Sequence, residues 1–415
     1  MTPKKRIIFV DDELQILQGL RRTLSRQSPE WEMTFVTSGS AALTAMAAAS
    51  FDVIVSDMRM PEMDGATLLE KVRNLYPQVA RIALSGQSEQ EMILRAVGST
   101  HQYLSKPCVP ELLKSTITRA CALRECLKIP KLQQVVSGMS YLPSLPSLYL
   151  ELLAEVNSTK ISLEKVSRII SNDLGMTAKI LQIANSEFFG LSQHIATARE
   201  AVTYLGLDVI RSLLLTFNIF SELNLEGLDK EHFTELWNHS LIVGVCARQI
   251  ANAEGVGIEM ANQSFTAGLL HDIARLVIAL NLPEQRKRIF VLSGAEQIPY
   301  LEAEREVVAA SHMEIGAYLL GLWGLPDSIV EATIFHHNPG DCTAKKFSPL
   351  TAVHVADCLY WQALGLKSGE ARAAQFDLAY LDTIGMADHV ADWQILCQVT
   401  LEEQLSEDLR SLVIK

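Results

Sequence analysis

Two patterns of hydrophobic and polar residues divide the chain near residue 125. In the first part, short apolar runs rich in Val and Ile alternate with segments of helical spacing. The predicted strands are Arg6–Val10, Met33–Val36, Val53–Ser56, Arg81–Leu84 and Gln102–Leu104. The predicted helices are Leu14–Arg26, Ser40–Ala49, Gly65–Leu75, Glu89–Val97 and Val109–Leu127. Because a helix follows every strand, this part is predicted to be an α/β domain with a parallel sheet covered on both faces.

The rest of the chain has apolar residues at helical spacing and no alternating strand pattern. We predict further helices near residues 207–222, 231–254, 258–281, 302–322, 327–336, 350–364 and 392–414. The chain is therefore expected to be multidomain. Its parts are an α/β domain at 1–125, a helical linker at 126–141, an all-α domain at 142–340 and a helical extension of that domain at 341–415.

Charge is unevenly distributed between these parts. The 415 residues carry a net charge of −12. Residues 1–125 contain 15 Lys and Arg against 14 Asp and Glu, whereas the remaining 290 residues contain 21 against 34. Because affinity for nucleic acid depends on basic residues that neutralise phosphates, so acidic a body argues against a nucleic-acid partner.

Neither hydrophobicity nor cysteine content indicates a membrane or secreted protein. No apolar run reaches the roughly 18 residues of a membrane span, and Ile7–Val10 is too short for a signal peptide. The seven cysteines include no CxxC pair, which favours a reducing compartment over a disulfide framework or a zinc ribbon. We therefore expect a cytoplasmic protein with no membrane partner.

Reactive side chains stand where the predicted strands end. Asp11 and Asp12 follow the first strand, Asp57 the third, Ser85 the fourth and Lys106 the fifth. The carboxyl ends of parallel strands meet at one edge of the sheet, so one crevice is expected to receive all of these groups. Clustered carboxylates suit Mg²⁺, a carboxylate beside the cation can attack phosphorus, and the hydroxyl and ammonium can hold phosphoryl oxygens. A single such residue is better explained as a helix cap or a solvated side chain, but four strand ends together favour a reactive site.

Four segments of this domain resemble a known family. They read IIFVDDE, VIVSDMRMPEMDG, IALSG and YLSKP, in that order. They are similar to the motifs of the receiver domain of two-component response regulators, and the resemblance covers residues 5–125. It implies a flavodoxin-like fold, a phosphoryl group donated by a sensor histidine kinase, and Mg²⁺ as cofactor.

The same resemblance assigns roles to single residues. It implies that Asp57 is the phosphoacceptor. Asp12, Asp57 and the backbone carbonyl of Arg59 would bind Mg²⁺ directly, and Asp11 would act through water.

Three further residues would respond to the phosphoryl group. Ser85 is similar to the hydroxyl that follows this group, Lys106 to its ion-pair partner and Tyr103 to the switch aromatic. The peptide bond between Lys106 and Pro107 is expected to be cis. The resemblance also allows a homodimer formed through the receiver.

Histidines and aspartates form a second candidate site in the helical part. Its members are His239, His271, Asp272, His312, His336, His337 and Asp357. Imidazole and carboxylate together suit Mn, Fe or Zn, and a pair of metals can activate water and clamp a phosphate. Buried histidines are as often satisfied by a neighbouring acid or carbonyl, so spacing alone leaves both interpretations open.

Residues 142–337 resemble the HDOD domain, a relative of the HD phosphohydrolases that is regarded as an output module. The segments that carry this resemblance include LPSLP, NDLGMTAKILQIANSEFFGL, AGLLHDIARLVIAL and HMEIGAYLLGLWGLP. The seven candidate ligands also match positions of the HD-GYP phosphodiesterases, which hydrolyse cyclic di-GMP. By this resemblance His239, His271, Asp272 and Asp357 form a first site, and His312, His336 and His337 a second.

Two departures count against that hydrolysis. Arg275 stands where the HD-GYP pattern has lysine, and Asn338 stands where it has glutamate, with no GYP loop after it. We therefore expect an HDOD output that acts mainly through contacts with an unidentified signalling protein. The alternative is a metal-dependent phosphohydrolase controlled by the receiver.

Overall fold

The computed structural model describes most of the chain. The described residues are 4–28, 30–86, 96, 99–126, 130–138, 146–156, 158, 161–185, 195–207, 209–210, 230–294, 298–364 and 375–413. The predicted helices at 89–97 and 207–222 lie largely outside these residues, as does part of the linker at 126–141.

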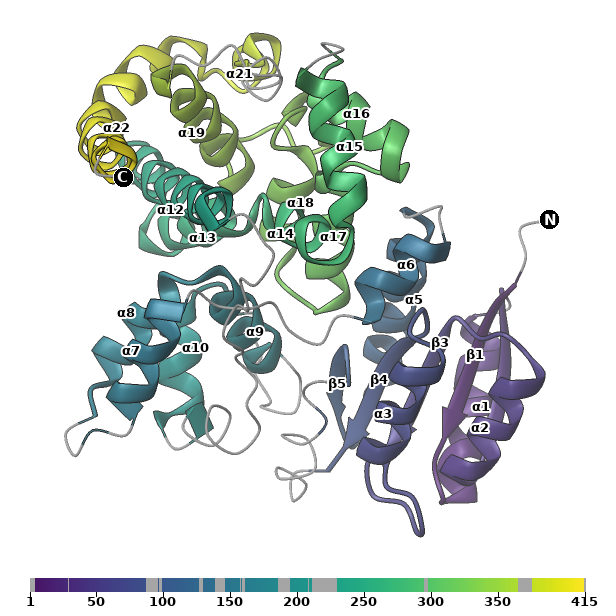
Figure 1. Cartoon of the computed structure of the whole chain (residues 1–415). Coiled ribbons are helices and arrows are strands. Elements are labelled where there is room, and N and C mark those ends of the chain that lie inside the picture. The colour runs from purple at the N-terminus through teal and green to yellow at the C-terminus, as the bar shows by residue number, and fades with distance from the viewer. Residues whose placement is uncertain are drawn as a thin grey trace.

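The first domain is a five-stranded parallel sheet, as predicted (Figure 1). Its strands are β1 (Lys5–Val10), β2 (Trp31–Val36), β3 (Val53–Asp57), β4 (Ala80–Ser85) and β5 (Gln102–Ser105), in the order β2-β1-β3-β4-β5. The described helices are α1 (Leu14–Gln27), α2 (Gly39–Ala48), α3 (Gly65–Leu75) and α5 (Pro110–Cys126).

Alternation along β1 explains why helices cover both faces of the sheet. Ile7 and Phe9 belong to the same buried cluster as Leu17 of α1 and Leu113 of α5. Their neighbours Ile8 and Val10 point to the opposite face and belong to the cluster that contains residues of α2 and α3. Both faces are therefore apolar, and polar chemistry is confined to the edge where the strands end.

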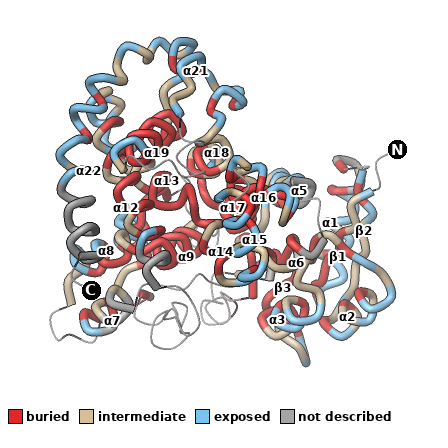
Figure 2. Tube along the Cα trace, turned by 45° about the horizontal axis from the view of Figure 1, so that its top comes forward, coloured by how far each residue is buried: buried red, intermediate tan, exposed pale blue. Residues whose placement is uncertain are grey.

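The rest of the described chain is helical, which confirms the predicted all-α part. Its helices are α6 (Pro130–Gly138), α7 (Pro146–Val156), α8 (Leu163–Ser171), α9 (Leu174–Ala184), α10 (Ala198–Leu205), α12 (Lys230–Ala253), α13 (Ile258–Leu270), α14 (Ile273–Asn281), α15 (Pro283–Gly294), α16 (Tyr300–Val308), α17 (His312–Leu322), α18 (Asp327–Phe335), η2 (Pro339–Asp341), α19 (Pro349–Leu364), α21 (Leu378–Thr383), η3 (Ala387–His389) and α22 (Val390–Val413). Burial is concentrated in the central helices, whereas α21 and α22 keep exposed outer faces (Figure 2).

Two predicted helices are each divided in the structure. The helix predicted at 258–281 is α13 followed by α14, with His271 and Asp272 at the break. The helix predicted at 302–322 is α16 followed by α17, and Ala309 at the break has a left-handed φ of 54°. Both corrections concern residues next to the histidine cluster.

The sheet domain and the helical domain are packed directly against each other. Gln102 of β5 donates a hydrogen bond of 3.2 Å from Nε2 to the carbonyl of Leu322, the last residue of α17. Arg119 of α5 donates one of 2.9 Å to the carbonyl of Leu325 and lies 3.0 Å from the carboxylate of Asp327. The face of β5 and α5 is therefore the docking face for α17 and α18.

Buried polar groups extend this interface to α6 and α9. The Arg81 guanidinium donates a hydrogen bond of 2.7 Å to the carbonyl of Ser137 in α6. The hydroxyl of Ser137 lies 2.6 Å from the hydroxyl of Tyr318 in α17. Gln182 of α9 donates to the carbonyl of Thr100, 3.2 Å away. Because these groups are buried on both sides, separation of the two domains would leave several of them without partners.

Within the described residues, no single helix is both long enough and apolar enough to cross a membrane. One pair, Ile258–Asn281 with Pro283–Gly294, meets the length and hydropathy criteria together but is bent by 116°.

Candidate functional site

The side chains predicted at the strand ends meet at one edge of the sheet. The Lys106 ammonium lies 2.6 Å from Asp57 Oδ1 and 2.7 Å from Asp11 Oδ2. Oxygen atoms of Asp11, Asp12 and Asp57 all lie within 4.8 Å of one another. The sheet thus assembles a carboxylate trio with one ammonium, which is the donor set that the sequence predicts for Mg²⁺ and phosphoryl chemistry.

Burial makes this cluster chemically distinct from a surface ion pair. Asp11 and Asp57 are 1% and 6% exposed. Burial lowers the pKa of Lys106, but hydrogen bonds and charge attraction from Asp11 and Asp57 outweigh it and raise that pKa overall. The hydroxyl of Ser85 is buried and has no hydrogen-bond partner within the described part of the chain. The Lys106 ammonium and the unbonded Ser85 hydroxyl are therefore both available near the buried Asp57 carboxylate.

A tight loop after β3 holds Asp57 in place. The Gly65 N–H donates 2.9 Å to the carbonyl of Met58, and a Cβ at Gly65 would lie only 2.1 Å from the Asp57 carbonyl oxygen. Asp64 caps α3 by accepting a hydrogen bond from Thr67 N. The Asp-Gly pair in MRMPEMDG is thus explained: Asp64 caps α3, and Gly65 has no side chain to collide with the backbone of Asp57. Arg59, with its predicted ligand carbonyl, lies in this same loop.

Tyr103 lies inside the molecule at the domain interface. It is 2% exposed, and burial raises the pKa of its phenol far above the usual value. Its neighbour Gln102 makes the hydrogen bond to α17 described above. The peptide bond Lys106–Pro107 between β5 and α5 is cis.

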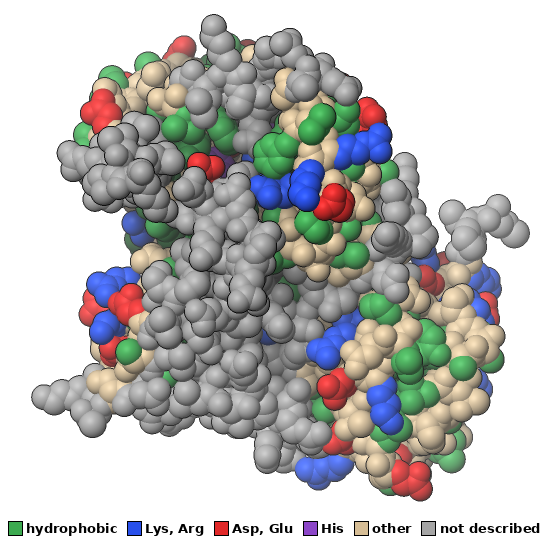
Figure 3. Space-filling view, in the orientation of Figure 1, with side chains coloured by type: hydrophobic (Ala, Val, Ile, Leu, Met, Phe, Trp, Pro, Cys, Tyr) green, Lys and Arg blue, Asp and Glu red, His purple; other side chains and the backbone are tan. Residues whose placement is uncertain are grey.

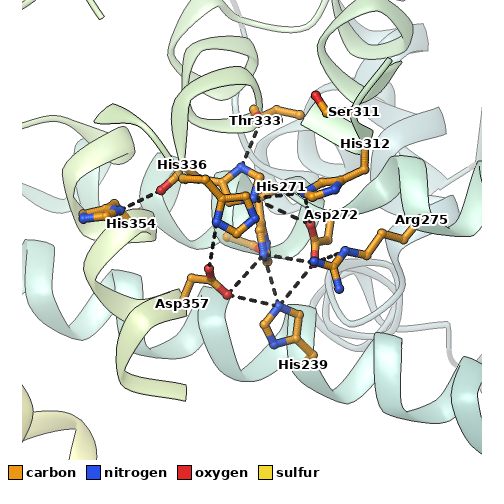
Figure 4. A network of polar contacts seen from close by, with 12 residues as sticks. His239, His271, Asp272, Arg275, Ser311, His312, Thr333, His336, His354 and Asp357 are labelled. Atoms are coloured by element: carbon orange, nitrogen blue, oxygen red, sulfur yellow. Dashed lines mark hydrogen bonds and ion pairs between the residues drawn. The ribbon is translucent and has the colours of Figure 1, made fainter. Parts of the chain in front are cut away.

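The seven residues of the histidine cluster also converge, although they come from distant segments. Figure 4 labels all of them except His337. His239 lies in α12, His271 and Asp272 lie between α13 and α14, and His312 begins α17. His336 and His337 follow α18, and Asp357 lies in α19. All seven side chains are at most 5% exposed.

Hydrogen bonds at the far side of three of the rings fix which nitrogen faces the cluster. Nδ1 of His271 donates to the carbonyl of Gly268 at 2.6 Å, and Nδ1 of His336 to the carbonyl of Thr333 at 2.9 Å. Nδ1 of His312 lies 2.8 Å from a carboxylate oxygen of Glu304. Because carbonyl and carboxylate oxygens accept, each Nδ1 carries the proton and each Nε2 presents a lone pair.

These lone pairs point at one another. His239 Nε2 and His271 Nε2 are 3.2 Å apart, and His312 Nε2 and His336 Nε2 are 3.4 Å apart. In these tautomers the Nε2 atoms of His312 and His336 are both acceptors, so no hydrogen bond can form between them. Such convergence of Nε2 atoms, with the rings of His271, His312 and His336 held through Nδ1, is typical of metal-binding histidines.

Asp272 joins the two halves of the cluster. Its Oδ1 lies 3.2 Å from His312 Nε2, and its Oδ2 lies 3.4 Å from His239 Nε2. Three-residue groups with ligand atoms within 4.8 Å are His239–His271–Asp357, His271–Asp272–His336 and His312–His336–His337. The donor set and its geometry fit a pair of transition metals that share one carboxylate.

Electrostatics keep these groups in the protonation states that bind metal. Burial lowers the pKa of His271, His336 and His337, so all three are neutral imidazoles. Burial raises the pKa of Asp272, but the positive charge of the Arg275 guanidinium, together with the neighbouring imidazoles, outweighs it and holds this pKa well below its usual value. Metal ligands have to be deprotonated, and these four groups meet that condition.

Sequence reasoning missed the residues that support the ligands. Glu304 is fully buried and binds both the backbone and the ring of His312. His354 donates from Nδ1 to the carbonyl of His336 at 2.6 Å and accepts from the Asp377 N–H. No motif marks Glu304, whereas His354 stands three residues before Asp357 and its spacing on the same helix was a usable signal.

The two departures from the phosphodiesterase pattern occupy different places. Arg275 Nε lies 3.0 Å from Asp272 Oδ2, so the guanidinium contacts the acid between the two halves. Asn338 is exposed at the start of η2.

Comparison with known families agrees with this geometry. A model of the response regulator receiver domain matches residues 7–118, and a model of the HDOD domain matches residues 142–339. The chain belongs to the response regulators with an HDOD domain. The sequence resemblance to both families is thereby confirmed.

Individual relatives match parts of the chain. An uncharacterized protein of Treponema pallidum is 29% identical over 197 residues, which are 48% of this chain and 38% of that protein. The hydrogenase transcriptional regulatory protein HoxA of Cupriavidus necator is 34% identical over 116 residues, 28% of this chain and 23% of its own. The solved MmoQ response regulator of Methylococcus capsulatus is 25% identical, with a TM-score of 0.43, over 59% of this chain and 98% of its own. This chain spans well under half of the length of these two curated relatives.

Proposed function

We propose that the protein is the receiving component of a two-component phosphorelay in the cytoplasm. A sensor histidine kinase donates a phosphoryl group to Asp57, and the receiver then changes how the HDOD domain contacts another signalling protein. The observation that carries this proposal is the contact of one ammonium, that of Lys106, with both Asp57 and Asp11 at the end of the sheet.

The side chains at this edge suit phosphoryl transfer. A carboxylate oxygen of Asp57 attacks phosphorus, the bond to the kinase histidine breaks, and an acyl phosphate remains on Asp57. Lys106 is held where it can pair with the new phosphoryl oxygens, and Ser85 has a hydroxyl to donate to them. Asp11, Asp12 and Asp57 would hold Mg²⁺, which supplies charge neutralisation at the phosphoryl oxygens.

The interface provides a route to the HDOD domain. Tyr103 and Gln102 are adjacent in β5, and Gln102 binds the carbonyl at the end of α17. The first residue of the same helix is His312, a member of the histidine cluster. A helix of 11 residues is about 16 Å long, so one rigid element connects the switch strand to the cluster.

For the HDOD domain we propose a bound pair of Mn, Fe or Zn ions with a structural or regulatory role. The fixed tautomers of His271, His312 and His336 support metal binding. A metal-dependent phosphohydrolase remains the second candidate, supported by the bridging position of Asp272. We favour the contact role because the chain has Asn338 where a ligand glutamate would stand and has no GYP loop.

Labelling with a small phosphodonor tests the receiver. With acetyl phosphate and Mg²⁺, intact-mass analysis should detect one added phosphoryl group on the wild-type protein and none on Asp57→Asn. Asp341→Asn, a change at an exposed acid of η2, is the control and should label as the wild type does. Undiminished labelling of Asp57→Asn would refute the assignment.

A further inference from the structure

A cavity of about 470 Å³ lies in the HDOD domain outside the histidine cluster. It is lined by α8, α9 and α10 on one side and by α12, α13 and Thr400 of α22 on the other, and it is partly open to solvent. In Figure 1, α8 and α10 lie below α12 and α13. Residues of both groups line the cavity. None of the seven cluster residues lines it. Its volume falls in the range of roughly 300–1,000 Å³ that is usual for small-molecule sites.

The lining has a charge opposite to that of the domain. Arg168 of α8, Arg199 of α10 and Arg248 of α12 line the cavity, and no Asp or Glu among the described residues does. The domains after residue 125 nevertheless contain 34 acidic residues against 21 basic ones. Figure 3 shows Lys and Arg side chains, with some acidic ones, at the left edge of the molecule. Three guanidinium groups from three helices thus surround one hollow in an acidic protein.

Two of these arginines have no acidic partner. Arg168 lies 3.5 Å from Glu151, but neither Arg199 nor Arg248 forms an ion pair within the described part of the chain. The Arg248 guanidinium lies 5.1 Å from the centre of the Phe265 ring, which orients it by a cation–π contact. Two guanidinium groups are therefore free to bind a ligand, and one of them is already positioned.

Neutral groups complete the lining. The side-chain amides of Asn172 and Asn262 line the cavity and have no hydrogen-bond partner within the described residues. The beginning of α10 also lines the cavity. Thr197 caps this helix by accepting from the Glu200 N–H, and the Glu200 carboxylate accepts from the Ala196 N–H, which leaves the N–H groups of Ala198 and Arg199 to favour an anion. Leu241, Ile242, Val245 and Phe265 supply an apolar wall.

We propose that this cavity is a binding site for a small phosphorylated molecule with a planar or apolar body, such as a nucleotide. The phosphate is recognised by Arg199, Arg248 and the start of α10, and the body lies against Phe265 and its apolar neighbours. Because arginine binds phosphate through two parallel hydrogen bonds, a phosphate is the anion that this lining fits best.

Calorimetry on the full-length protein tests the proposal, with ADP, pyrophosphate and adenosine as probes. Excess EDTA removes metals from the receiver and the histidine cluster, so binding there through a metal is eliminated. ADP should bind, Arg248→Gln and Arg199→Gln should each weaken it at least about tenfold, and adenosine should bind far more weakly. Comparable binding of pyrophosphate would support the site as one for phosphate groups alone, and weaker binding would support a nucleotide.

Arg286→Gln provides a matched control. Arg286 also lies over a phenylalanine, 5.0 Å from the ring centre of Phe290, but it is on α15 and outside the cavity. This variant should bind ADP as the wild type does. The proposal is wrong if ADP fails to bind at about 1 mM, if adenosine binds as well as ADP, or if Arg286→Gln weakens binding as much as Arg248→Gln.

Discussion

Lys106 contacts two acids in the unphosphorylated protein, so its contacts should change when Asp57 is phosphorylated. Its ammonium lies 2.6 Å from Asp57 and 2.7 Å from Asp11. Under the proposed function, its partners after phosphorylation of Asp57 would include phosphoryl oxygens, so its contacts would differ between the two states. Lys106→Ala should retain the fold and accept phosphate but lose the phosphorylation-dependent change in shape.

Small-angle scattering with and without acetyl phosphate measures that loss. Lys71→Ala, a change on the exposed side of α3, serves as the control and should respond as the wild type does. An unchanged response in Lys106→Ala would show that the ammonium has no role in coupling.

Lys179 is a buried base that should make stability depend on pH. Burial, and to a smaller extent the charge of Arg73, lowers its pKa from 10.5 to about 7. Between pH 10.5 and 7 the unfolded chain binds a proton that the folded chain does not, so stability falls as pH falls through this range and is level below it. Lys179→Met should therefore be more stable than the wild type at pH 7 by on the order of 3 kcal/mol, and the difference should vanish near pH 10.

Thermal unfolding across pH 6–10 tests this expectation. The Lys179 ammonium donates a hydrogen bond of 2.9 Å to Gln182 Oε1. Loss of that bond in Lys179→Met subtracts about 1 kcal/mol from the gain in stability. Lys287→Met, at a lysine with 72% of its side chain exposed, should show no such pH dependence. A constant difference between Lys179→Met and the wild type at all pH values would refute the assigned pKa.

The side chains at the strand ends could be predicted, whereas among the supports of the histidine cluster only His354 left a signal in the sequence. Asp57, Ser85 and Lys106 stand at or just after strand ends, and the geometry of a parallel sheet brings such positions together. Glu304 reaches His312 from the neighbouring helix α16, and no sequence motif marks that contact. The carbonyl of Gly268 is only three residues before His271, but a sequence pattern does not show which backbone carbonyl a ring will bind. The sequence pattern therefore indicated the candidate ligands but not Glu304 or the carbonyl of Gly268, which hold the ligand rings.

Helix boundaries limited prediction at the scale of elements. The apolar run through 258–281 continues across the break, so nothing in its period marks His271 and Asp272 as a junction. The second break did carry a signal, because Ser311 and Glu314 form a capping box at the start of α17. Both breaks place ligands at helix ends, where a ring can reach the centre of the bundle.

The contact of β5 and α5 with α17 and α18 should be the mechanical link between the domains. Gln102→Ala and Arg119→Gln together remove hydrogen bonds to the carbonyls of Leu322 and Leu325. We expect the domain contact to weaken by about 1–3 kcal/mol and the region between the domains to become more susceptible to limited proteolysis. Arg22→Gln, a change on the exposed surface of α1, should leave the digestion pattern unchanged.

A digestion rate equal to that of the wild type in the double variant would contradict this role. Phosphorylation of Asp57 should remain normal in both variants, because neither changed residue lies at the phosphoryl site.

At the scale of the whole molecule, a bound metal should stabilise the helical bundle against unfolding. The seven ligands come from α12, the α13–α14 junction, α17, the end of α18 and α19. A metal at one hundred times its dissociation constant adds about 2.7 kcal/mol of stability, so chelation should lower the melting temperature of the HDOD domain by several degrees. Asp272→Ala should lose metal in elemental analysis and be insensitive to chelation.

Asn338→Ala is the control for this experiment, because Asn338 is exposed. It should retain both the metal and the response to chelator. A wild-type protein that contains no metal after reconstitution with Mn, Fe and Zn would leave the histidines a structural role alone.

The position of α17 has a consequence that works in both directions. One end of this helix accepts a hydrogen bond from the switch strand, and the other end begins with His312. If phosphorylation alters metal affinity by some factor through this helix, thermodynamic reciprocity requires metal to alter the equilibrium of phosphorylation by the same factor. The metal supply of the cell would then set how readily the receiver accepts its signal, and an output domain would serve as a second input.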